Sequence, residues 1–496
     1  MKTESKIILA ICLLSLTAFS GCKNKADFDT RPRLTYMVQS DKTYLPDSPF
    51  AKELCEKTGI DVKYIVAQPG NYYEHLNILK LSSSLPDIIE SNWLDYNGGV
   101  NEAISDGYII PLNDLLEEHS PNLAGYLKSH PEVNKQVITD DGIYYAYPFL
   151  RDDSSLNVYG GFIIRTDWLE ESNLPVPETL ADWERTLTVF RDKYKAESPI
   201  MMPANNHFKS AFGITEGFYV EDGRVKFGSA EQGYREYLET MNRWFNQGFF
   251  QPEFPSLHMQ DTTITMQNGT CGALYGTAGN TMGTLIKAGT PVIGTPYPVK
   301  NKGDTPFSSQ YDCQYTPNNA AAISPACTIP ETAAKLLDFG YSEEGKLLYN
   351  FGIEGESYTL SGGYPLFTDT ILRNESGLSI ADAMNKYLRA STSAPCIQTS
   401  EYFNQYLSDE RQKLSLRRWQ QTDAQKHKLP PIYSTDKEFN SLKRTIEDYA
   451  KQTEIEFIIG LKNLDEFDSY VNTLYEKGLG DILSRYQEAY GRYLMK

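Results

Sequence analysis

The sequence lacks the features that mark several large classes of protein. Only 7 cysteines and 6 histidines occur among its 496 residues. No two cysteines have the C-x-x-C spacing of zinc or redox sites, and there is no H-E-x-x-H, G-x-S-x-G or P-loop motif. The long apolar run at the start, Ile7 to Phe19, is too short to span a bilayer. These absences argue against the common metalloprotease, serine hydrolase and NTPase classes and against an integral membrane protein.

Positive charge is also scarce. Lysine and arginine number 47 against 65 acidic residues, which gives a net charge of -18 and a pI near 4.9. This balance argues against nucleic acid or an anionic lipid surface as the main partner, although an ordinary soluble surface protein explains it as well. The cysteines beyond residue 22 are odd in number and widely spaced, which favours buried thiols and leaves one disulfide open.

The first 22 residues form a targeting segment. Lysines precede the apolar run, and residues 19–22 (FSGC) end it with small residues before a cysteine. These four residues resemble a bacterial lipobox, with Phe19 in place of the usual leucine. The resemblance implies cleavage before Cys22 and lipidation of its thiol, with residues 23–30 as a polar tether. An ordinary signal peptide with an incidental cysteine is the alternative.

After the tether, strand and helix patterns alternate. Residues 34–38, 62–67 and 86–89 have the composition of buried strands, and helical patterns at 49–57 and 72–81 separate them. This β-α-β-α-β order predicts a parallel sheet with right-handed crossovers. Because such sheets bind ligands beyond the carboxyl ends of their strands, we expect the loop after the third strand to form one wall of a ligand cleft. Its candidate residues are Asn92, Trp93, Asp95 and Tyr96.

The rest of the chain continues this mixed pattern. Thr179 and Asp182 predict a helix N-cap with a near capping box. The helix predicted over 229–248 carries an apolar and aromatic stripe that we expect in a core. Further strands are predicted at 143–148, 161–165, 272–275 and 319–323, and further helices within 107–118, over 331–339 and from 436 onward.

Several of these pieces together resemble a known family. LPDII (85–89), FIIRTDWL (162–169), GFFQPEF (248–254), GIEGESY (352–358) and YQEAYGRY (486–493) occur in the order found in extracellular solute-binding proteins of bacterial ABC importers. The chain is similar to the large lipoprotein branch that serves oligosaccharides, which includes alginate- and pectin-fragment binders. The resemblance implies an α/β fold of two lobes, periplasmic-binding-protein-like, with a hinge and an interlobe cleft.

The resemblance also implies how the chain is divided. The first lobe would hold residues 31–149 with about 318–375, and the second 150–317 with about 376–496, joined at a hinge. The crossings are expected near 148–151, near 316–319 and after Tyr358. Many relatives carry a calcium loop after the helix that ends here near Phe190, but Arg191 to Met202 lacks the alternating oxygen ligands. We therefore expect no structural calcium, no other metal and no cofactor.

A sugar site combines aromatic platforms with side chains that exchange several hydrogen bonds. Trp93 and Tyr96 are the expected platforms, although Trp93 packed between helices is the alternative. Asn92 and Asp95 are the expected hydroxyl partners. Arg151 could bind a uronate carboxylate or pair with a neighbouring aspartate, Asp152 or Asp153. Further candidates are Tyr147, Asn206, His207, Tyr275, Thr277, Glu354 and Tyr358, with a solvated His207 and a structural Glu354 as alternatives. Arg165 and Asp167 are expected to pair with each other or with backbone near the hinge.

The implied function is that of a lipid-anchored monomer on the extracellular face of the bacterial cell membrane. It would capture an oligosaccharide between its lobes and deliver it to the permease of an ABC transporter, without acting as an enzyme. One alternative is a membrane-anchored glycoside hydrolase, which needs two carboxylates about 5 to 9.5 Å apart. A surface adhesin or a sensor domain is another. The sequence names neither the sugar nor its charge.

Overall fold

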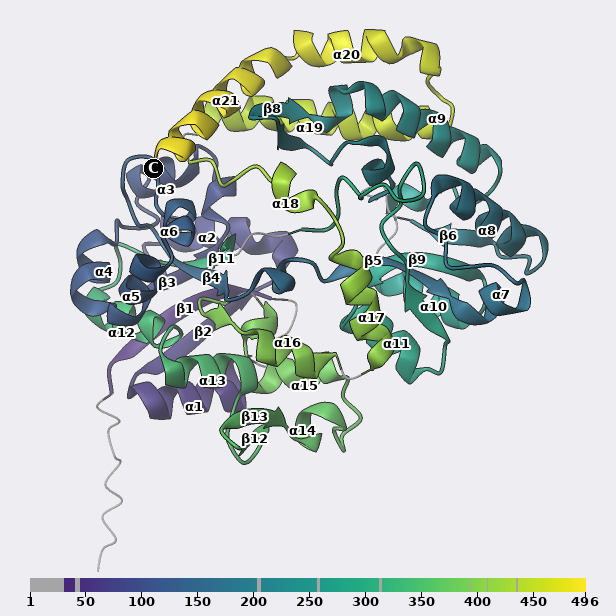
Figure 1. The fold of residues 1–496 in the computed structure, drawn as a ribbon. Helices are drawn as coiled ribbons and strands as arrows, with labels where there is room; N and C mark the ends of the chain where they lie inside the picture. The colour runs from purple at the N-terminus through teal and green to yellow at the C-terminus, as the bar shows by residue number, and fades with distance from the viewer. Residues whose placement is uncertain are drawn as a thin grey trace, which may run out of the picture.

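Among the described residues, the alternating strands and helices of the first 150 build most of one of two large β-sheets. In the computed structural model, which describes residues 31–40, 45–202, 207–256, 259–311, 315–392, 394–407, 409–433 and 436–496, each sheet carries helices on both faces (Figure 1). Cys22 and Asn206, both predicted to be functional, lie outside these residues. The two sheets with their helices form two lobes, so the predicted two-lobed α/β fold is confirmed.

The first sheet has the strand order β14-β4-β11-β3-β1-β2. Its parallel strands β1 (Arg33–Gln39), β2 (Asp61–Ala67) and β3 (Ile88–Ser91) alternate with α1 (Pro49–Thr58) and α2 (Tyr72–Leu81), as predicted. β11 (Tyr315–Ile323) runs antiparallel between β3 and β4 (Tyr147–Arg151), and β14 (Ile397–Gln398) pairs parallel with β4.

Strand β4 starts later than the predicted 143–148. The carbonyl of Tyr144 accepts a hydrogen bond from the Leu112 backbone N–H at 2.8 Å, which holds 143–146 outside the ladder. Hydrophobic cores cover both faces of the sheet. The other helices of this region are α3 (Gly99–Ser105), α4 (Asn113–His119), α5 (Pro121–Ser129), α6 (Pro131–Val137), α12 (Pro330–Phe339) and α13 (Glu343–Phe351).

The second sheet has the strand order β10-β5-β9-β6. Its strands are β5 (Gly160–Arg165), β6 (Ser198–Met201), β9 (Cys271–Thr277) and β10 (Val292–Gly294). The predicted capping box is confirmed at the start of α8 (Leu180–Asp192), where Thr179 and Asp182 bond each other reciprocally. The aromatic stripe of α9 (Gln232–Asn246) is buried in the core of this lobe, as predicted. Beside them lie α7 (Thr166–Glu171), α10 (Met259–Gln267), α11 (Asn280–Lys287), α17 (Glu410–Trp419) and the hairpin β7 (Phe218–Glu221) and β8 (Arg224–Phe227).

Three C-terminal helices arch over the top of the view in Figure 1, from the second lobe toward the first. α19 (Lys437–Ile458), α20 (Phe467–Glu476) and α21 (Leu479–Met495) bury their apolar faces in the core of the second lobe. At the other end, Arg492 and Lys496 pair with Asp140 of the first lobe at 3.1 and 2.9 Å. The C-terminal helices therefore contact both lobes.

Two of the three expected crossings between the sheets fall inside strands. Residues 148–151 and 316–319 lie inside β4 and β11, because β4 is paired along this length by β11 on one side and β14 on the other. The connections between the sheets lie between β4 and β5, between β10 and β11, and, after Tyr358, between β14 and α17. The last of these contains α16 (Ser400–Tyr406) and follows a small region made of β12 (Tyr358–Ser361), β13 (Tyr364–Phe367), α14 (Asp369–Leu372) and α15 (Ile380–Tyr387).

A buried ion pair fastens this late segment to the first sheet. The guanidinium of Arg389 donates two hydrogen bonds of 3.0 Å to the two carboxylate oxygens of Glu90 in β3. The hydroxyl of Tyr36 donates a third, at 2.6 Å. Both charged side chains are buried, and the charge of Glu90 contributes to holding the pKa of Arg389 above its ordinary value against the opposing effect of burial. The pair joins residues that lie 299 positions apart in the chain.

We expect Arg389→Met to lower the free energy of unfolding by about 3 to 5 kcal/mol, because it leaves a buried carboxylate without its partner. Urea denaturation followed by tryptophan fluorescence measures the change. The matched control is Arg373→Met, which removes an exposed ion pair with Asp369 and should cost less than about 1 kcal/mol. Equal losses in the two variants would contradict a special role for the buried pair.

A second prediction concerns the contact between α16 and the start of α11. A Cβ added to Gly279 would overlap the ring of Tyr406. Gly279→Ala should therefore lower stability by about 1 to 3 kcal/mol in the same denaturation assay, and the double variant with Tyr406→Ala should recover part of the loss. Gly491→Ala, where a Cβ meets open space within α21, should be neutral or stabilising by up to about 1 kcal/mol. If Gly279→Ala is as stable as the wild type, the contact between Gly279 and the ring of Tyr406 is not tight.

Candidate ligand-binding cleft

The carboxyl ends of strands in the two sheets lie close together. β4 ends at Arg151, and only residues 152–159 separate it from β5, whose first residue Gly160 pairs with Thr277 at the end of β9. Since β11 runs antiparallel to both β3 and β4, the loop after Ser91 lies on the same edge as Arg151. Open α/β sheets bind ligands at such ends. We define the facing edges as residues 91–96 and 151–153 of the first lobe and 207–217 and 275–281 of the second.

The loop after β3 presents polar groups to this space. The side chain of Asn92 caps the 3-10 turn Trp93–Asp95 by accepting from the Leu94 N–H at 3.2 Å, and its amide donates to Asp95 at 2.7 Å. Asp95 is exposed. The pair thus offers an amide and a carboxylate that exchange hydrogen bonds readily with hydroxyl groups.

The two expected aromatic platforms of this loop have other contacts. Trp93 is only 1 % exposed and its indole N–H donates to the carbonyl of Ala320 at 3.1 Å, so it packs in the core, as in the alternative interpretation. Tyr96 turns away, because its hydroxyl donates to Asp106 at 2.7 Å and its ring lies against Tyr108. We therefore do not retain either ring as a platform.

Tyr147 and Arg151 are also buried. The hydroxyl of Tyr147 shares a 2.6 Å hydrogen bond with Ser120 inside the first lobe. Arg151 is 5 % exposed, with its guanidinium 5.2 Å from the centre of the Phe149 ring. Neither side chain stands at the mouth of the cleft, and the burial of Arg151 speaks against its use as an exposed clamp for a uronate.

His207 and Tyr275 come together on the second lobe. Their ring centres are 4.9 Å apart, and Tyr297 closes the group at 5.6 Å from His207. Burial lowers the pKa of His207 to about 4, so its imidazole is neutral at physiological pH. Thr277 has a structural role, since its backbone N–H donates to Thr281 at 3.1 Å and its hydroxyl accepts from the Thr281 N–H at the start of α11.

Glu354 and Tyr358 lie away from the facing edges, in the small region around β12. Tyr358 is buried against Phe351, with ring centres 6.0 Å apart. Glu354 is exposed and its backbone bridges that of Tyr358, which agrees with the structural alternative. Arg165 and Asp167 pair with each other, with a shortest contact of 2.5 Å, as predicted.

Sequence reasoning missed a buried network behind the loop at His207. Lys209 is 2 % exposed and donates to Glu454 of α19 at 3.0 Å and to Glu216. Burial alone would lower the pKa of Lys209, but the charges of Glu216 and Glu454 outweigh it and hold the pKa above its ordinary value. The two partners of Lys209 come from distant segments, so no local sequence signal could have identified the network.

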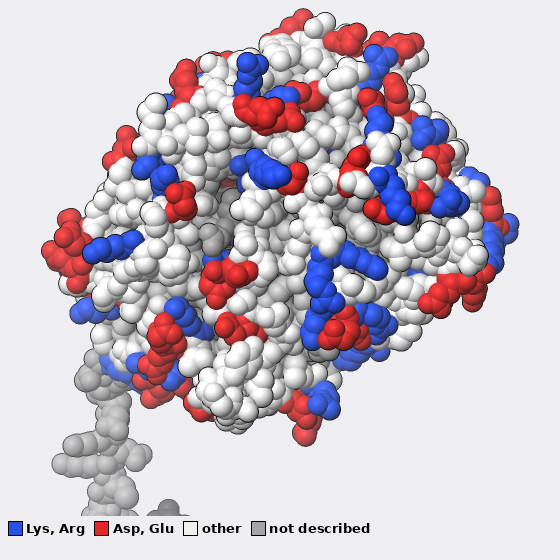
Figure 2. Space-filling model, viewed as in Figure 1, with Lys and Arg blue, Asp and Glu red and all other residues white. Residues whose placement is uncertain are grey.

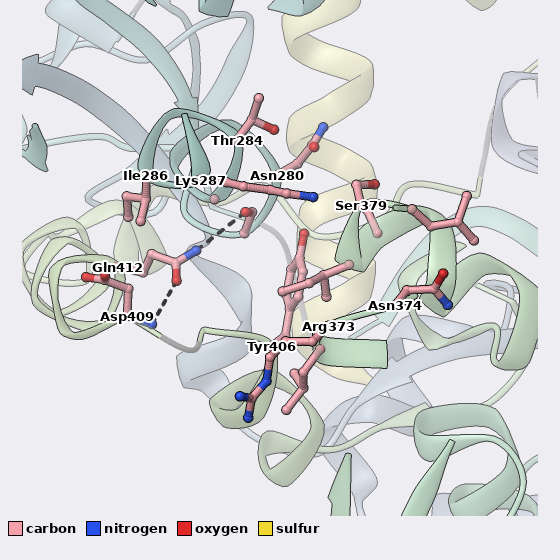
Figure 3. A pocket seen from close by; sticks show the side chains of 16 residues that line it. Asn280, Thr284, Ile286, Lys287, Arg373, Asn374, Ser379, Tyr406, Asp409 and Gln412 are labelled. Carbon is pink, nitrogen blue, oxygen red and sulfur yellow. Dashed lines mark hydrogen bonds between the residues drawn. The ribbon is translucent and has the colours of Figure 1, made fainter. Parts of the chain in front are cut away.

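A groove between the lobes was missed as well. Figure 3 shows this space of about 530 Å³, with α11 on one side and residues of α14 and α15 on the other. The side chains of Lys287 and Tyr406 point toward a common space in it, with Ser379 opposite, and Asn280 lies beside Lys287 on the same helix. The ammonium of Lys287 in α11 and the hydroxyl of Tyr406 in α16 thus approach each other beside the connection that contains α16.

Among the described residues, no helix has the length and apolar character needed to cross a membrane, and no group of three or more His, Cys, Asp or Glu side chains is placed to hold a metal ion. Residues 191–202 form the end of α8, a turn and β6, with Asp192 paired to Arg191. Acidic and basic side chains are interspersed over the face seen in Figure 2.

Known proteins resemble this chain in sequence and in structure. The chain is similar over 99 % of its length to lipoprotein LipO of Bacillus subtilis, with 24 % identity and 95 % of that protein covered. It is 27 % identical over 51 % of its length to the fructooligosaccharide ABC transporter substrate-binding protein FusA of Streptococcus pneumoniae, and spans about half of that relative, 53 %.

Solved structures show the same fold. An alginate-binding protein, AlgQ2, solved without calcium, superposes with a TM-score of 0.77 at 23 % identity and covers 93 % of this chain and 98 % of its own. FusA of S. pneumoniae in complex with kestose gives 0.74 at 20 % identity, covering 93 % and 99 %. The profile of the bacterial extracellular solute-binding proteins matches residues 42–347. Because that match covers more than half of the chain, the protein belongs to the bacterial extracellular solute-binding protein family.

Proposed function

We propose that the protein captures an oligosaccharide between its two lobes and delivers it to the permease of an ABC importer. The observation that carries this proposal is the two-lobed structure, similar over 93 % of the chain to a FusA structure solved with kestose. The curated relatives include a fructooligosaccharide-binding protein and a polygalacturonan/rhamnogalacturonan-binding protein, which supports a saccharide over other solutes.

The facing edges supply the contacts that such a ligand needs. Asn92 and Asp95 on the first lobe offer hydrogen bonds to hydroxyl groups, and the ring group of His207 and Tyr275 on the second lobe offers an apolar surface for a sugar face. A ligand that touches both lobes favours the closed arrangement only through the contacts that the open form lacks. Closure would then present the loaded protein to its permease.

We propose a revised division into lobes. The first would consist of 31–151 and 315–398, and the second of 160–294 and 410–419 together with most of the C-terminal helices. Support comes from β14, which pairs with β4 in the first sheet, and from α17, which packs on β10 of the second. Both lobes remain discontinuous, and 152–159, 295–314 and 399–409 are the hinge connections.

We further propose that Cys22 carries a lipid anchor and that the protein works as a monomer on the extracellular face of the cell membrane. The lipobox-like residues 19–22 support the anchor, as does the similarity to a lipoprotein of B. subtilis. We expect no turnover of the captured sugar, in keeping with a family of binding proteins. No observation favours the hydrolase alternative.

The first test is the melting temperature of the chain lacking residues 1–22, measured against neutral and uronate-containing oligosaccharides. A ligand at about 100 times its Kd should add about 2.7 kcal/mol of stability, which raises the midpoint by several degrees. The sugar is then recovered and analysed for cleavage. If no saccharide raises the melting temperature, sugar capture is refuted. If the recovered sugar is cleaved, the protein is a glycoside hydrolase instead.

The anchor has its own test. With Cys22→Ala, the protein should move from the membrane fraction to the soluble fraction of a bacterium that processes lipoproteins, because two acyl chains hold a protein on a bilayer far more firmly than the polypeptide alone. Immunoblotting of the fractions measures this, and Cys55→Ala is the matched control. Membrane retention of Cys22→Ala would show that another feature holds the protein there.

A further inference from the structure

A stripe along α19 connects the two lobes. Asn440, Glu447 and Glu454 are spaced by seven residues and therefore lie on one face of the helix. The amide of Asn440 donates to the carbonyl of Tyr96 in the first lobe at 3.0 Å. Glu454 accepts from Lys209 and from the hydroxyl of Tyr234 in the second lobe, at 3.0 and 2.8 Å. Glu447 thus sits midway, about 10 Å along the helix from either contact.

The surroundings of Glu447 include a carboxylate from each lobe. Its side chain is 42 % exposed, with Lys443 of the same helix 3.9 Å away. Burial raises the pKa of Glu447, Lys443 opposes this, and the charges of Asp95 from the first lobe, Asp448 from α19 and Glu216 from the second lobe raise it further. Burial raises the pKa of Tyr486 in α21, and the charges of Glu447 and Asp95 raise it further. Glu447 lies on the helix between the contact that Asn440 makes with Tyr96 of one facing edge and the contact that Glu454 makes with Lys209 of the other.

The basic side chains of the facing edges are not presented to a ligand. Arg151 is buried, Lys209 is buried against Glu216 and Glu454, and the imidazole of His207 is neutral at physiological pH. Asp95, in contrast, is exposed, and the side chain of Glu216 is half exposed. The described residues of the facing edges thus meet a ligand with negative charge and with neutral hydrogen-bonding groups.

We propose that Glu447 contacts the ligand and that, with Asp95 and Glu216, it makes the cleft select uncharged oligosaccharides over uronate oligomers. This inference rests on the proposed function of sugar capture. Carboxylates bind sugar hydroxyls strongly because hydrogen bonds to a charged acceptor exceed those to a neutral one. A uronate placed among the same carboxylates carries a charge of the same sign and is repelled. Such repulsion of the wrong ligand is one way in which a binding site becomes selective.

The test is titration calorimetry of the chain lacking residues 1–22. The probes are uncharged fructo-, gluco- and manno-oligosaccharides, and oligomers of galacturonate and of alginate, each at low and at physiological salt. We expect an uncharged oligosaccharide to bind at least about 10-fold more tightly than any uronate oligomer, with the difference larger at low salt because charge repulsion is then less screened.

Glu447→Gln should weaken binding of the uncharged sugar by about 10- to 100-fold and reduce the discrimination against uronates. Glu438→Gln, an exposed acid in the first turn of the same helix, is the matched control and should leave both affinities unchanged. Asp95→Asn, on an exposed loop of the other lobe, should act in the same direction as Glu447→Gln if that variant is too unstable to measure.

The outcomes separate the two proposals. Tighter binding of a uronate oligomer by the wild type, or unchanged affinities in both Glu447→Gln and Asp95→Asn, would overturn this inference while leaving sugar capture intact. A wild type that binds no saccharide would overturn sugar capture, and the inference with it.

Discussion

The pairing of Arg389 with Glu90 is the contact on which the course of the chain depends. Two charges are taken out of water inside the first lobe, and such burial is tolerated only where the geometry is bidentate and the remaining oxygen lone pairs find donors. Tyr36 supplies one of these donors. Because Arg389 lies on the approach to β14, the pair returns the chain to the first sheet after the small region around β12 and β13.

That return determines where the chain leaves the first lobe for the last time. From β14 it enters α16, whose Tyr406 packs directly on Gly279, and then α17, whose Ser415 hydroxyl accepts from the backbone N–H of Gly294 at 2.7 Å. Hinge-like closure of one lobe on the other is the motion that the proposed function requires. Each lobe has hydrophobic cores of its own, yet each sheet is assembled from separate stretches of the sequence.

Buried ion pairs also determine which charged side chains remain exposed. The chain carries more acidic than basic residues, and some of its basic side chains form ion pairs inside the protein. Lys209 pairs with Glu216 and Glu454, and Arg389 pairs with Glu90. A lysine or arginine engaged in this way stabilises the fold but offers no charge to a ligand. The edges that face each other across the lobes are consequently left with exposed carboxylates, and α19 contributes another from the side.

The sequence by itself determined the local elements and the type of fold. Apolar periodicity identified the strands of the parallel unit and the stripe of α9, and the spacing of Thr179 and Asp182 identified a helix cap, because these depend on residues close in the chain. It also identified the polar loop of Asn92 and Asp95, since a loop after a buried parallel strand must lie at the carboxyl edge. The tertiary structure decided what those residues face. Trp93, Tyr147 and Arg151 are suited by type to a sugar site, but the packing of β11 against β3 and β4 buries them. Glu447 carries no local signal, and it gains its position only because Asn440 and Glu454 are fixed by opposite lobes, through contacts across hundreds of residues.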